Sequence, residues 1–394
     1  LCRFNTLFII SINELITDYQ QSLMNSLIDY DSELWAKLLD QISISDLFNL
    51  VEAGGFQTNL IDSIGKPRAY DTDGPAGFNA NVNAIGDKDF AKWTAYPSET
   101  VIGSTWNKDL AHKMGLMMGY ESQTTKVQGW YAPGVNLHRS AYTARNYEYY
   151  SEDPVLSGKM AAEVILGAKT NGLYCYLKHF VVSEPGPNPD NLNTWLTEQN
   201  LRENYLKPFE IAVKDGGANA IMSAFNRCGS VWCGASYPLI TQILRNEWGF
   251  QGSVITDYCT PQKSVDGYMS VRQGVRAGND LWLNPNSGAL EQGLRKDNPT
   301  DVSCARRAAK NIIYTYIDTY VYGSTHTAKF AEYNIDVSIN ISKALSTWWI
   351  PTLIVIESVV MLGLLFWSFM SVRQMVILRG QLIASGELVI EKKP

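Results

Sequence analysis

Short apolar runs alternate with helical segments through the middle of the chain. Apolar residues recur at helical spacing in three segments, and glycine separates each segment from a following apolar run. These pairs are residues 154–169 and 173–177, 198–215 and 220–224, and 236–249 and 253–256. A further amphipathic helix begins near Thr300. Repeated units of this length predict an α/β fold whose parallel strands close into a TIM-type (β/α)8 barrel.

Residues 348–372 form an apolar stretch in which Glu357 is the one ionisable residue. About 20 such residues span a bilayer as a helix. Trp348, Trp349 and Trp367 lie toward the ends, where aromatic side chains meet the membrane surface. The alternative is a buried helix of a soluble domain, but such a helix is rarely this long without a polar face. We therefore expect a single C-terminal transmembrane helix.

Basic residues flank this stretch unequally. Those that follow it are Arg373, Arg379, Lys392 and Lys393, and those that precede it are Lys329 and Lys343. Because positive charge favours the cytoplasmic side, residues 373–394 are expected to form a cytoplasmic tail. The barrel is then extracellular, on a single-pass protein of the cell membrane.

The other expected boundaries follow from polarity. Residues 1–34 are interpreted as a linker with some helix, residues 35–322 as the barrel and residues 323–347 as a polar stalk. The first residue is Leu1 and not Met, which suggests a chain that begins inside a longer protein.

Composition narrows the classes of partner. The net charge is −6 and no run of Lys or Arg occurs, which excludes the basic footprint of a nucleic-acid binder. The six cysteines form no CxxC pair and no zinc-like spacing, so we expect no metal and no cofactor. A bridge between Cys228 and Cys233 stays open.

Polar side chains follow the predicted strands, at the end of a barrel where active sites lie. They are Asp73, then Asn136, His138 and Arg139, then Lys178 and His179, then Asn226, and finally Asp257. Taken singly, each residue could be a helix cap or a paired surface charge. Together they predict carboxylates and cations that converge on one mouth.

The order of these segments and their amino-acid sequences resemble glycoside hydrolase family 3, over roughly residues 35 to 320. The motifs are Asp73-Gly74-Pro75-Ala76-Gly77, Gly103-Ser104-Thr105-Trp106-Asn107, Pro133-Gly134-Val135-Asn136, Arg145-Asn146-Tyr147-Glu148-Tyr149-Tyr150-Ser151-Glu152-Asp153-Pro154, Lys178-His179-Phe180, the segment 201–210, Met222-Ser223-Ala224-Phe225-Asn226, and Ile255-Thr256-Asp257-Tyr258.

The resemblance implies a retaining exo-β-glycosidase of the β-glucosidase or β-xylosidase type, which hydrolyses terminal non-reducing β-linked sugars of an oligosaccharide or β-glycoside. It implies that Asp257 is the nucleophile. The residues implied to bind the substrate are Asp73, Arg145, Lys178, His179, Met222 and Tyr258. Trp106, Trp130 and Trp282 could add apolar faces, although core packing is favoured for Trp106 and Trp130. Glu152 and Asp153 fit the start of a helix.

A retaining glycosidase also needs a second carboxyl about 5 Å from the nucleophile. In most of the family this acid/base lies on an α/β sandwich domain after the barrel, and only the stalk, the apolar stretch and the tail follow here. The family's alternative His-Asp dyad is absent, because residues 180–200 contain no His. Some members carry the sandwich domain before the barrel. We therefore expect a permuted, membrane-anchored member whose acid/base lies in a missing sandwich domain.

Two other functions stay open. One is a membrane-tethered carbohydrate-binding or sensory module that kept the pocket and lost turnover, although a binder does not need Asp257. The other is an aldolase in which Lys178 forms a Schiff base.

Overall fold

The computed structural model describes residues 29–79, 93–184, 190, 192–285, 290–317, 319 and 349–385. The chain divides into two compact units, Leu1–Tyr333 and Asn334–Pro394, which are described separately. Most of the expected linker and all of the expected stalk lie outside the described residues.

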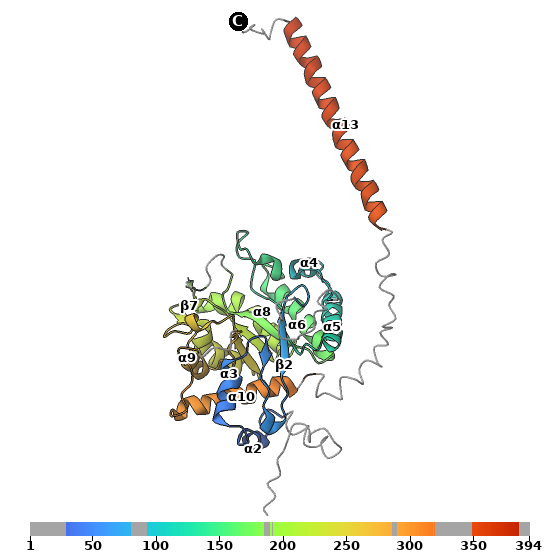
Figure 1. The fold of residues 1–394 in the computed structure, drawn as a ribbon. Coiled ribbons are helices and arrows are strands. Elements are labelled where there is room, and N and C mark those ends of the chain that lie inside the picture. The colour runs from blue at the N-terminus through green and yellow to red at the C-terminus, as the bar shows by residue number, and fades with distance from the viewer. Residues whose placement is uncertain are drawn as a thin grey trace, which may run out of the picture. The chain divides into compact units, whose positions relative to one another are not determined.

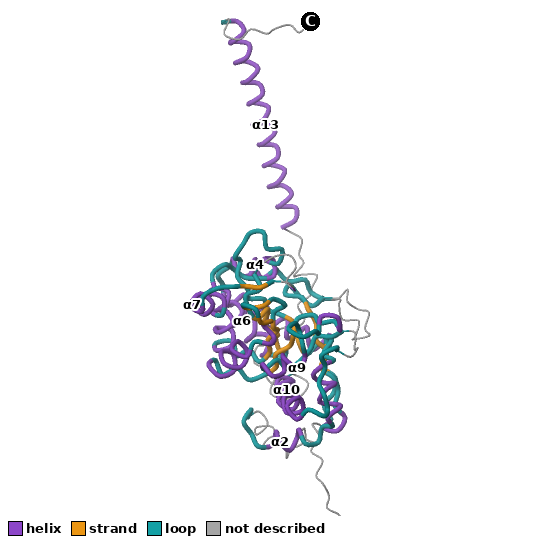
Figure 2. Tube along the Cα trace, turned by 90° about the vertical axis from the view of Figure 1, so that its left-hand side faces the viewer, coloured by secondary structure: helices purple, strands orange, loops and turns teal. Residues whose placement is uncertain are grey.

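A six-stranded sheet forms the centre of the first unit, with helices around it (Figure 2). Its strands, in spatial order, are β1 (Gln57–Thr58), β2 (Ala69–Asp73), β3 (Gly129–Tyr131), β4 (Tyr174–Phe180), β6 (Ala220–Ser223) and β9 (Ser253–Thr256). Strands β2 to β9 pair in parallel, whereas β1 runs antiparallel to β2. All these parallel strands therefore end on the same side.

Backbone hydrogen bonds connect β9 back to β2 through residues that lie outside the regular strands. They run from Thr256 N to Leu281 O (2.8 Å), from Trp282 N to Val51 O (2.8 Å) and from Asp71 N to Phe56 O (2.9 Å). The predicted barrel-like α/β fold is confirmed. The described residues do not show eight regular parallel strands, because the end of helix α3 (Ile44–Glu52) and the irregular backbone at residues 53–56 close the ring. A Cβ on Gly54 would lie 2.9 Å from the backbone oxygen of Trp282, so the close approach of the two backbones favours glycine there.

The helices cover the sheet in two groups (Figure 1). Helices α4 (Glu99–Ser104), α5 (Lys108–Thr125), α6 (Pro154–Thr170) and α8 (Lys207–Lys214) form one group; α2 (Leu34–Leu39), α3 (Ile44–Glu52) and α10 (Pro299–Ile317) form the other. The described residues also form α7 (Glu198–Asn200), the π-helices η6 (Leu201–Tyr205) and η8 (Pro238–Glu247), and α9 (Val271–Ala277). The predicted helices are confirmed. Asp153 caps α6, accepting the Leu156 N–H at 2.7 Å.

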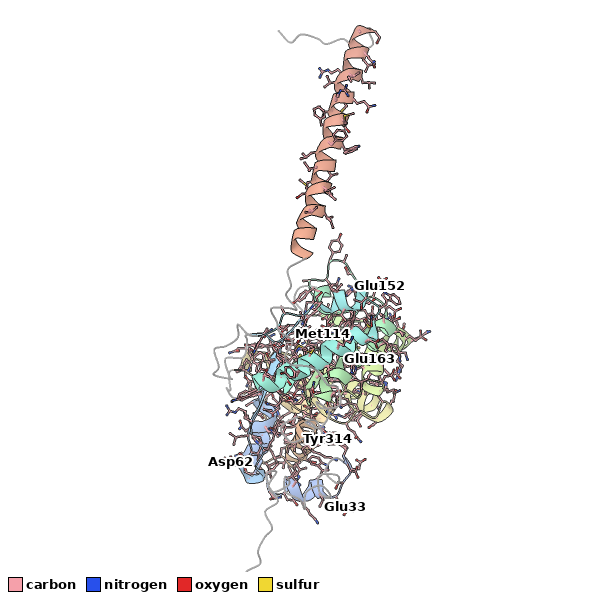
Figure 3. The ribbon with its side chains drawn as sticks, turned by 90° about the vertical axis from the view of Figure 1, so that its right-hand side faces the viewer. Glu33, Asp62, Met114, Glu152, Glu163 and Tyr314 are labelled. Carbon is pink, nitrogen blue, oxygen red and sulfur yellow. The ribbon has the colours of Figure 1, made fainter. Side chains whose placement is uncertain are left out.

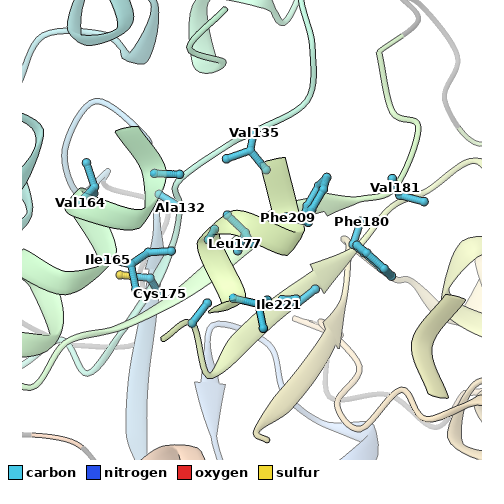
Figure 4. Packing of buried hydrophobic residues seen from close by; sticks show 14 of the residues in the cluster. Ala132, Val135, Val164, Ile165, Cys175, Leu177, Phe180, Val181, Phe209 and Ile221 are labelled. Atoms are coloured by element: carbon cyan, nitrogen blue, oxygen red, sulfur yellow. The ribbon is translucent and has the colours of Figure 1, made fainter. Parts of the chain in front are cut away.

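The two groups lie at different ends of the unit in Figure 3, where Met114 of α5 and Glu163 of α6 are far from Tyr314 of α10. Glu163 links α6 to α5 through Lys108 Nζ at 2.8 Å. Figure 4 shows the core under the first group, where Leu177 and Ile221 of the sheet pack beside Ile165 and Phe209.

A small second sheet lies beyond β4 and β6. It consists of β5 (Asn193–Thr194), β7 (Arg227–Cys228) and β8 (Val231–Trp232). Cys228 at the end of β7 and Cys233 directly after β8 are free thiols, so the structure contains no bridge between them.

The second unit contains α13 (Trp349–Ala384). Within it, Ser358–Leu382 is long and apolar enough to cross a membrane by length and composition, with a mean hydropathy of 1.6. The helix continues past residue 372, where the sequence predicted the tail to begin. Arg373 and Arg379 are therefore helical residues.

Candidate active site

The carboxyl ends of the parallel strands bring the predicted ionic residues together. Asp73 is the last residue of β2, Lys178 and His179 lie near the end of β4, and Asp257 directly follows β9. Arg145 comes from the loop after β3 and precedes a short 3-10 turn, Asn146–Glu148. The expected convergence at one mouth is confirmed for Asp73, Lys178, His179 and Asp257. Arg145, which only the family resemblance indicated, joins them through His179.

Lys178 lies at the centre of an ionic cluster. Its Nζ donates to Asp73 Oδ1 at 2.7 Å and lies 3.5 Å from Glu148 Oε2. Burial opposes the charged form of Lys178, but the two carboxylates outweigh burial and raise its pKa. Burial likewise opposes ionisation of Asp73, and Lys178 outweighs it and lowers the pKa of that carboxyl. Because an aldolase lysine must be a neutral amine, this cluster argues against a Schiff base.

Asp257 has one bound and one free carboxylate oxygen. Its Oδ1 accepts the N–H of Tyr258 at 2.7 Å, and its own N–H donates to Ser223 O at 3.1 Å. Its Oδ2 is buried and accepts no hydrogen bond from any residue that the structure describes. Burial raises the pKa of Asp257 to about 6, against the lowering effects of Arg145, the Tyr258 N–H and Lys178. A fixed carboxylate with one uncommitted oxygen is suited to nucleophilic attack.

His179 is held as a neutral ring. Arg145 donates to Nε2 at 2.8 Å, and because arginine only donates, the ring proton lies on Nδ1 and is directed at Tyr149 Oη, 3.2 Å away. Burial, with the positive charges of Arg145 and Lys178, lowers the pKa of His179 well below its ordinary value. His179 Nε2 lies 3.7 Å from Asp257 Oδ2, so both side chains could contact the same bound ligand.

The backbone of His179 is clamped by an amide that the sequence assigned no such role. Asn136 Oδ1 accepts the His179 N–H at 2.8 Å, and Asn136 Nδ2 donates to His179 O at 3.1 Å. Glu184 in turn accepts from Asn136 Nδ2 at 3.2 Å and from the Leu137 N–H at 3.3 Å. Burial raises the pKa of Glu184 to about 7, against these hydrogen bonds.

The sequence also missed the pairing role of Glu148, although the spacing of Arg145 and Glu148 on one turn was a usable signal. Glu148 is buried and ion-pairs with both Arg145 and Lys178. It therefore serves to fix these two cations.

The remaining predicted residues lie in different surroundings. Met222 is buried within β6 among core residues, directly before Ser223, which accepts the Asp257 N–H. Tyr258 is partly exposed beside Asp257. Core packing is confirmed for Trp130 but wrong for Trp106, which is 74% exposed after α4. Trp282 is fully buried and offers no face to a sugar.

A cleft of about 780 Å³ opens beside the ionic cluster. Its lining includes Asp73, Arg145 and Glu148 of the cluster, with Tyr147 and Trp93, whereas Lys178, His179 and Asp257 lie outside this lining. A volume of this order accommodates a small ligand such as a sugar. Among the described residues, no group of three His, Cys, Asp or Glu side chains could hold a metal ion.

The fold and site together define an α/β barrel-like protein with a carboxylate and cation cluster at its carboxyl-end mouth. The family model of the glycosyl hydrolase family 3 N terminal domain matches residues 82–298, more than half of the chain. The chain therefore belongs to glycoside hydrolase family 3, through its N-terminal domain.

Relatives support this membership. The chain is 33% identical over 247 residues to a β-glucosidase of Rhizobium radiobacter, covering 62% of this chain and 29% of that protein. It is 35% identical over 246 residues to β-glucosidase A of Butyrivibrio fibrisolvens, covering 62% and 28%. The chain thus spans less than a third of the length of these relatives.

Solved structures are also similar. β-Glucosidase 3B from Thermotoga neapolitana in complex with glucose has a TM-score of 0.63 at 29% identity, over 76% of this chain and 46% of that one. A β-glucosidase from Paenibacillus barengoltzii has a TM-score of 0.65 at 28% identity, over 80% and 35%.

Proposed function

We propose that this chain is the barrel part of a retaining exo-β-glycosidase of the β-glucosidase type, with Asp257 as nucleophile. The observation that carries the proposal is the buried Oδ2 of Asp257, which accepts no hydrogen bond from the described residues and lies 3.7 Å from His179 in a mouth that also holds Lys178 and Arg145. The names of the similar proteins support a β-glucoside as the substrate class.

Asp257 Oδ2 attacks the anomeric carbon, and the bond to the leaving oxygen breaks with its electron pair on that oxygen. A general acid protonates the leaving group. Water then attacks the glycosyl-enzyme, gives its proton to the same group acting as base, and releases Asp257. Asp73, Arg145 and Lys178 orient the sugar through charge-assisted hydrogen bonds to its hydroxyls.

The acid/base group is proposed to come from a domain outside this chain. Asp73 and Glu148 are both engaged by Lys178, so neither is an uncommitted proton donor. Glu184 is the alternative within the chain, because its raised pKa suits a general acid. We further propose that α13 anchors the protein in the cell membrane, with the barrel outside and the C-terminus in the cytoplasm.

Leaving-group dependence tests this function. General acid assistance contributes about 10²–10⁴-fold, and only where the leaving group needs a proton. The full chain should cleave dinitrophenyl β-glucoside far better than an alkyl glucoside, and azide should accelerate turnover by attacking the glycosyl-enzyme. Efficient hydrolysis of alkyl glucosides that is lost in Glu184→Gln would place the acid inside the chain. Binding of glucose with no turnover of any aryl glycoside would favour the tethered binding module.

A further inference from the structure

The first turn of helix α4 contacts two segments of the loop between β3 and α6, one around Gly134 and one at residues 146–149. Glu99 and Thr100 are consecutive there, and Glu99 is 1% exposed. Neither residue belongs to the proposed catalytic or sugar-binding set, so their polar contacts need a separate explanation.

Glu99 fixes the first of these segments, around Gly134. Its two carboxyl oxygens lie 2.9 and 3.1 Å from the N–H of Gly134. The neighbours of Gly134 bind the backbone of Lys178, since Lys178 N donates to Pro133 O at 3.0 Å and Val135 N donates to Lys178 O at 2.8 Å. One glycine therefore links Glu99 to the strand position of the central lysine.

Thr100 fixes the second segment, which directly follows Arg145. Its hydroxyl lies 2.8 Å from Asn146 O and 3.0 Å from Tyr149 O, as a donor to these carbonyls. The two segments also touch each other at Gly134, where a Cβ would lie 2.4 Å from Glu148 O and 2.9 Å from Tyr149 Cδ1. A shift of α4 would therefore displace Lys178, Glu148 and the Tyr149 partner of His179 together.

We propose that Glu99 and Thr100 are positioning residues that hold the sugar-binding cations of the mouth in register. The proposal rests on the proposed glycosidase function. In a site of this kind, a displacement of about 1 Å can cost 10²-fold, even when the changed residue does not touch the substrate.

Conservative and disruptive variants distinguish this positioning role from a contribution to folding stability alone. Burial raises the pKa of Glu99 well above its ordinary value. The amide oxygen of Gln can accept the Gly134 N–H in place of the carboxyl oxygen of Glu99. Glu99→Gln and Thr100→Ser should behave like the wild type, whereas Glu99→Met and Thr100→Val lose the acceptor or the donor. Thr315→Val is the matched control, because Thr315 binds Asn219 O and the Ser253 N–H at the other end of the strands.

The measurement uses the full chain in detergent. Inactivation by dinitrophenyl 2-deoxy-2-fluoro-β-glucoside gives KI, kinact and the labelled fraction, and calorimetry gives the Kd for glucose. Glu99→Met and Thr100→Val should raise KI and Kd by about tenfold or more, as expected for misplaced charged hydrogen-bond donors. Thr315→Val should lower the melting temperature and leave KI unchanged.

Three results would overturn the proposal. A lower labelled fraction with wild-type KI in Glu99→Met and Thr100→Val would show a purely structural role. Equal losses in Glu99→Gln and Thr100→Ser would exclude these hydrogen bonds as the cause. A wild type that neither binds glucose nor is labelled would refute the proposed function itself, and the positioning role with it.

Discussion

Lys178 Nζ lies 2.7 Å from Asp73 Oδ1, although 105 residues separate the two in sequence. β3 lies between their strands, so the pair crosses the mouth of the sheet. With Glu148 on its other side, Lys178 is a buried cation between two carboxylates. The carboxylates hold the ammonium charged and fixed where a neutral polyol could accept from it.

Removal of this cation should weaken sugar binding. A hydrogen bond from a charged group contributes about 1.5–3 kcal/mol, so Lys178→Met should raise the Kd for glucose by roughly 10–100-fold. Calorimetry measures this directly. Lys159→Met is the control, since the exposed Lys159 of α6 pairs with Asp215 at the end of α8, away from the mouth. Unchanged glucose affinity in Lys178→Met would show that the sugar does not contact this cluster.

The rate of reaction at Asp257 should fall at acidic pH, where this carboxyl is protonated. Its pKa is raised to about 6 by burial, and the nucleophile must be ionised to attack. The rate constant kinact/KI for the fluoroglucoside should therefore rise with pH through about 6 and then level off. A rate that is flat between pH 4.5 and 7.5 would contradict the assignment.

The same group should make folding stability depend on pH. Between its ordinary pKa near 3.8 and about 6, folded Asp257 retains a proton that the unfolded chain has lost. The folded state then binds more protons, so this contribution to stability falls as pH rises through that window. Asp257→Asn should flatten the fall and be more stable than the wild type at pH 7. Thermal unfolding at pH 4.5 and 7 tests this, and parallel curves for both proteins would oppose it.

The sequence predicted the residues of the ionic cluster better than the residues that hold them in place. Asp73, Lys178 and Asp257 directly follow or end apolar runs, and parallel strands bring such positions to one edge. The pairing of Glu148 and the Asn136 clamp depend on loop conformations that periodicity does not encode. Trp106 was assigned to the core by residue type, but it has φ +54° after α4 and lies exposed. The irregular closure of the strand ring near Gly54 was likewise not predicted, because the prediction assumed repeated strand and helix units.

The anchor proposal predicts how the protein fractionates. The full chain should stay with membranes through carbonate washing, because Ser358–Leu382 offers enough apolar length to span a bilayer. A chain ending at residue 340 should be soluble and keep its affinity for glucose. Release of the full chain by carbonate would reject the span, and protection of the barrel from protease on intact cells would reject the orientation.

The nucleophile is tested most directly by peptide mapping of the full chain after reaction with dinitrophenyl 2-deoxy-2-fluoro-β-glucoside. The fluorine slows both steps and the reactive leaving group needs no acid, so the glycosyl-enzyme should accumulate even without the acid/base. We predict one sugar per chain, attached to Asp257, and no label in Asp257→Asn, while Asp215→Asn labels like the wild type. A label on Asp73, Glu148 or Glu184, or full labelling of Asp257→Asn, would contradict the account.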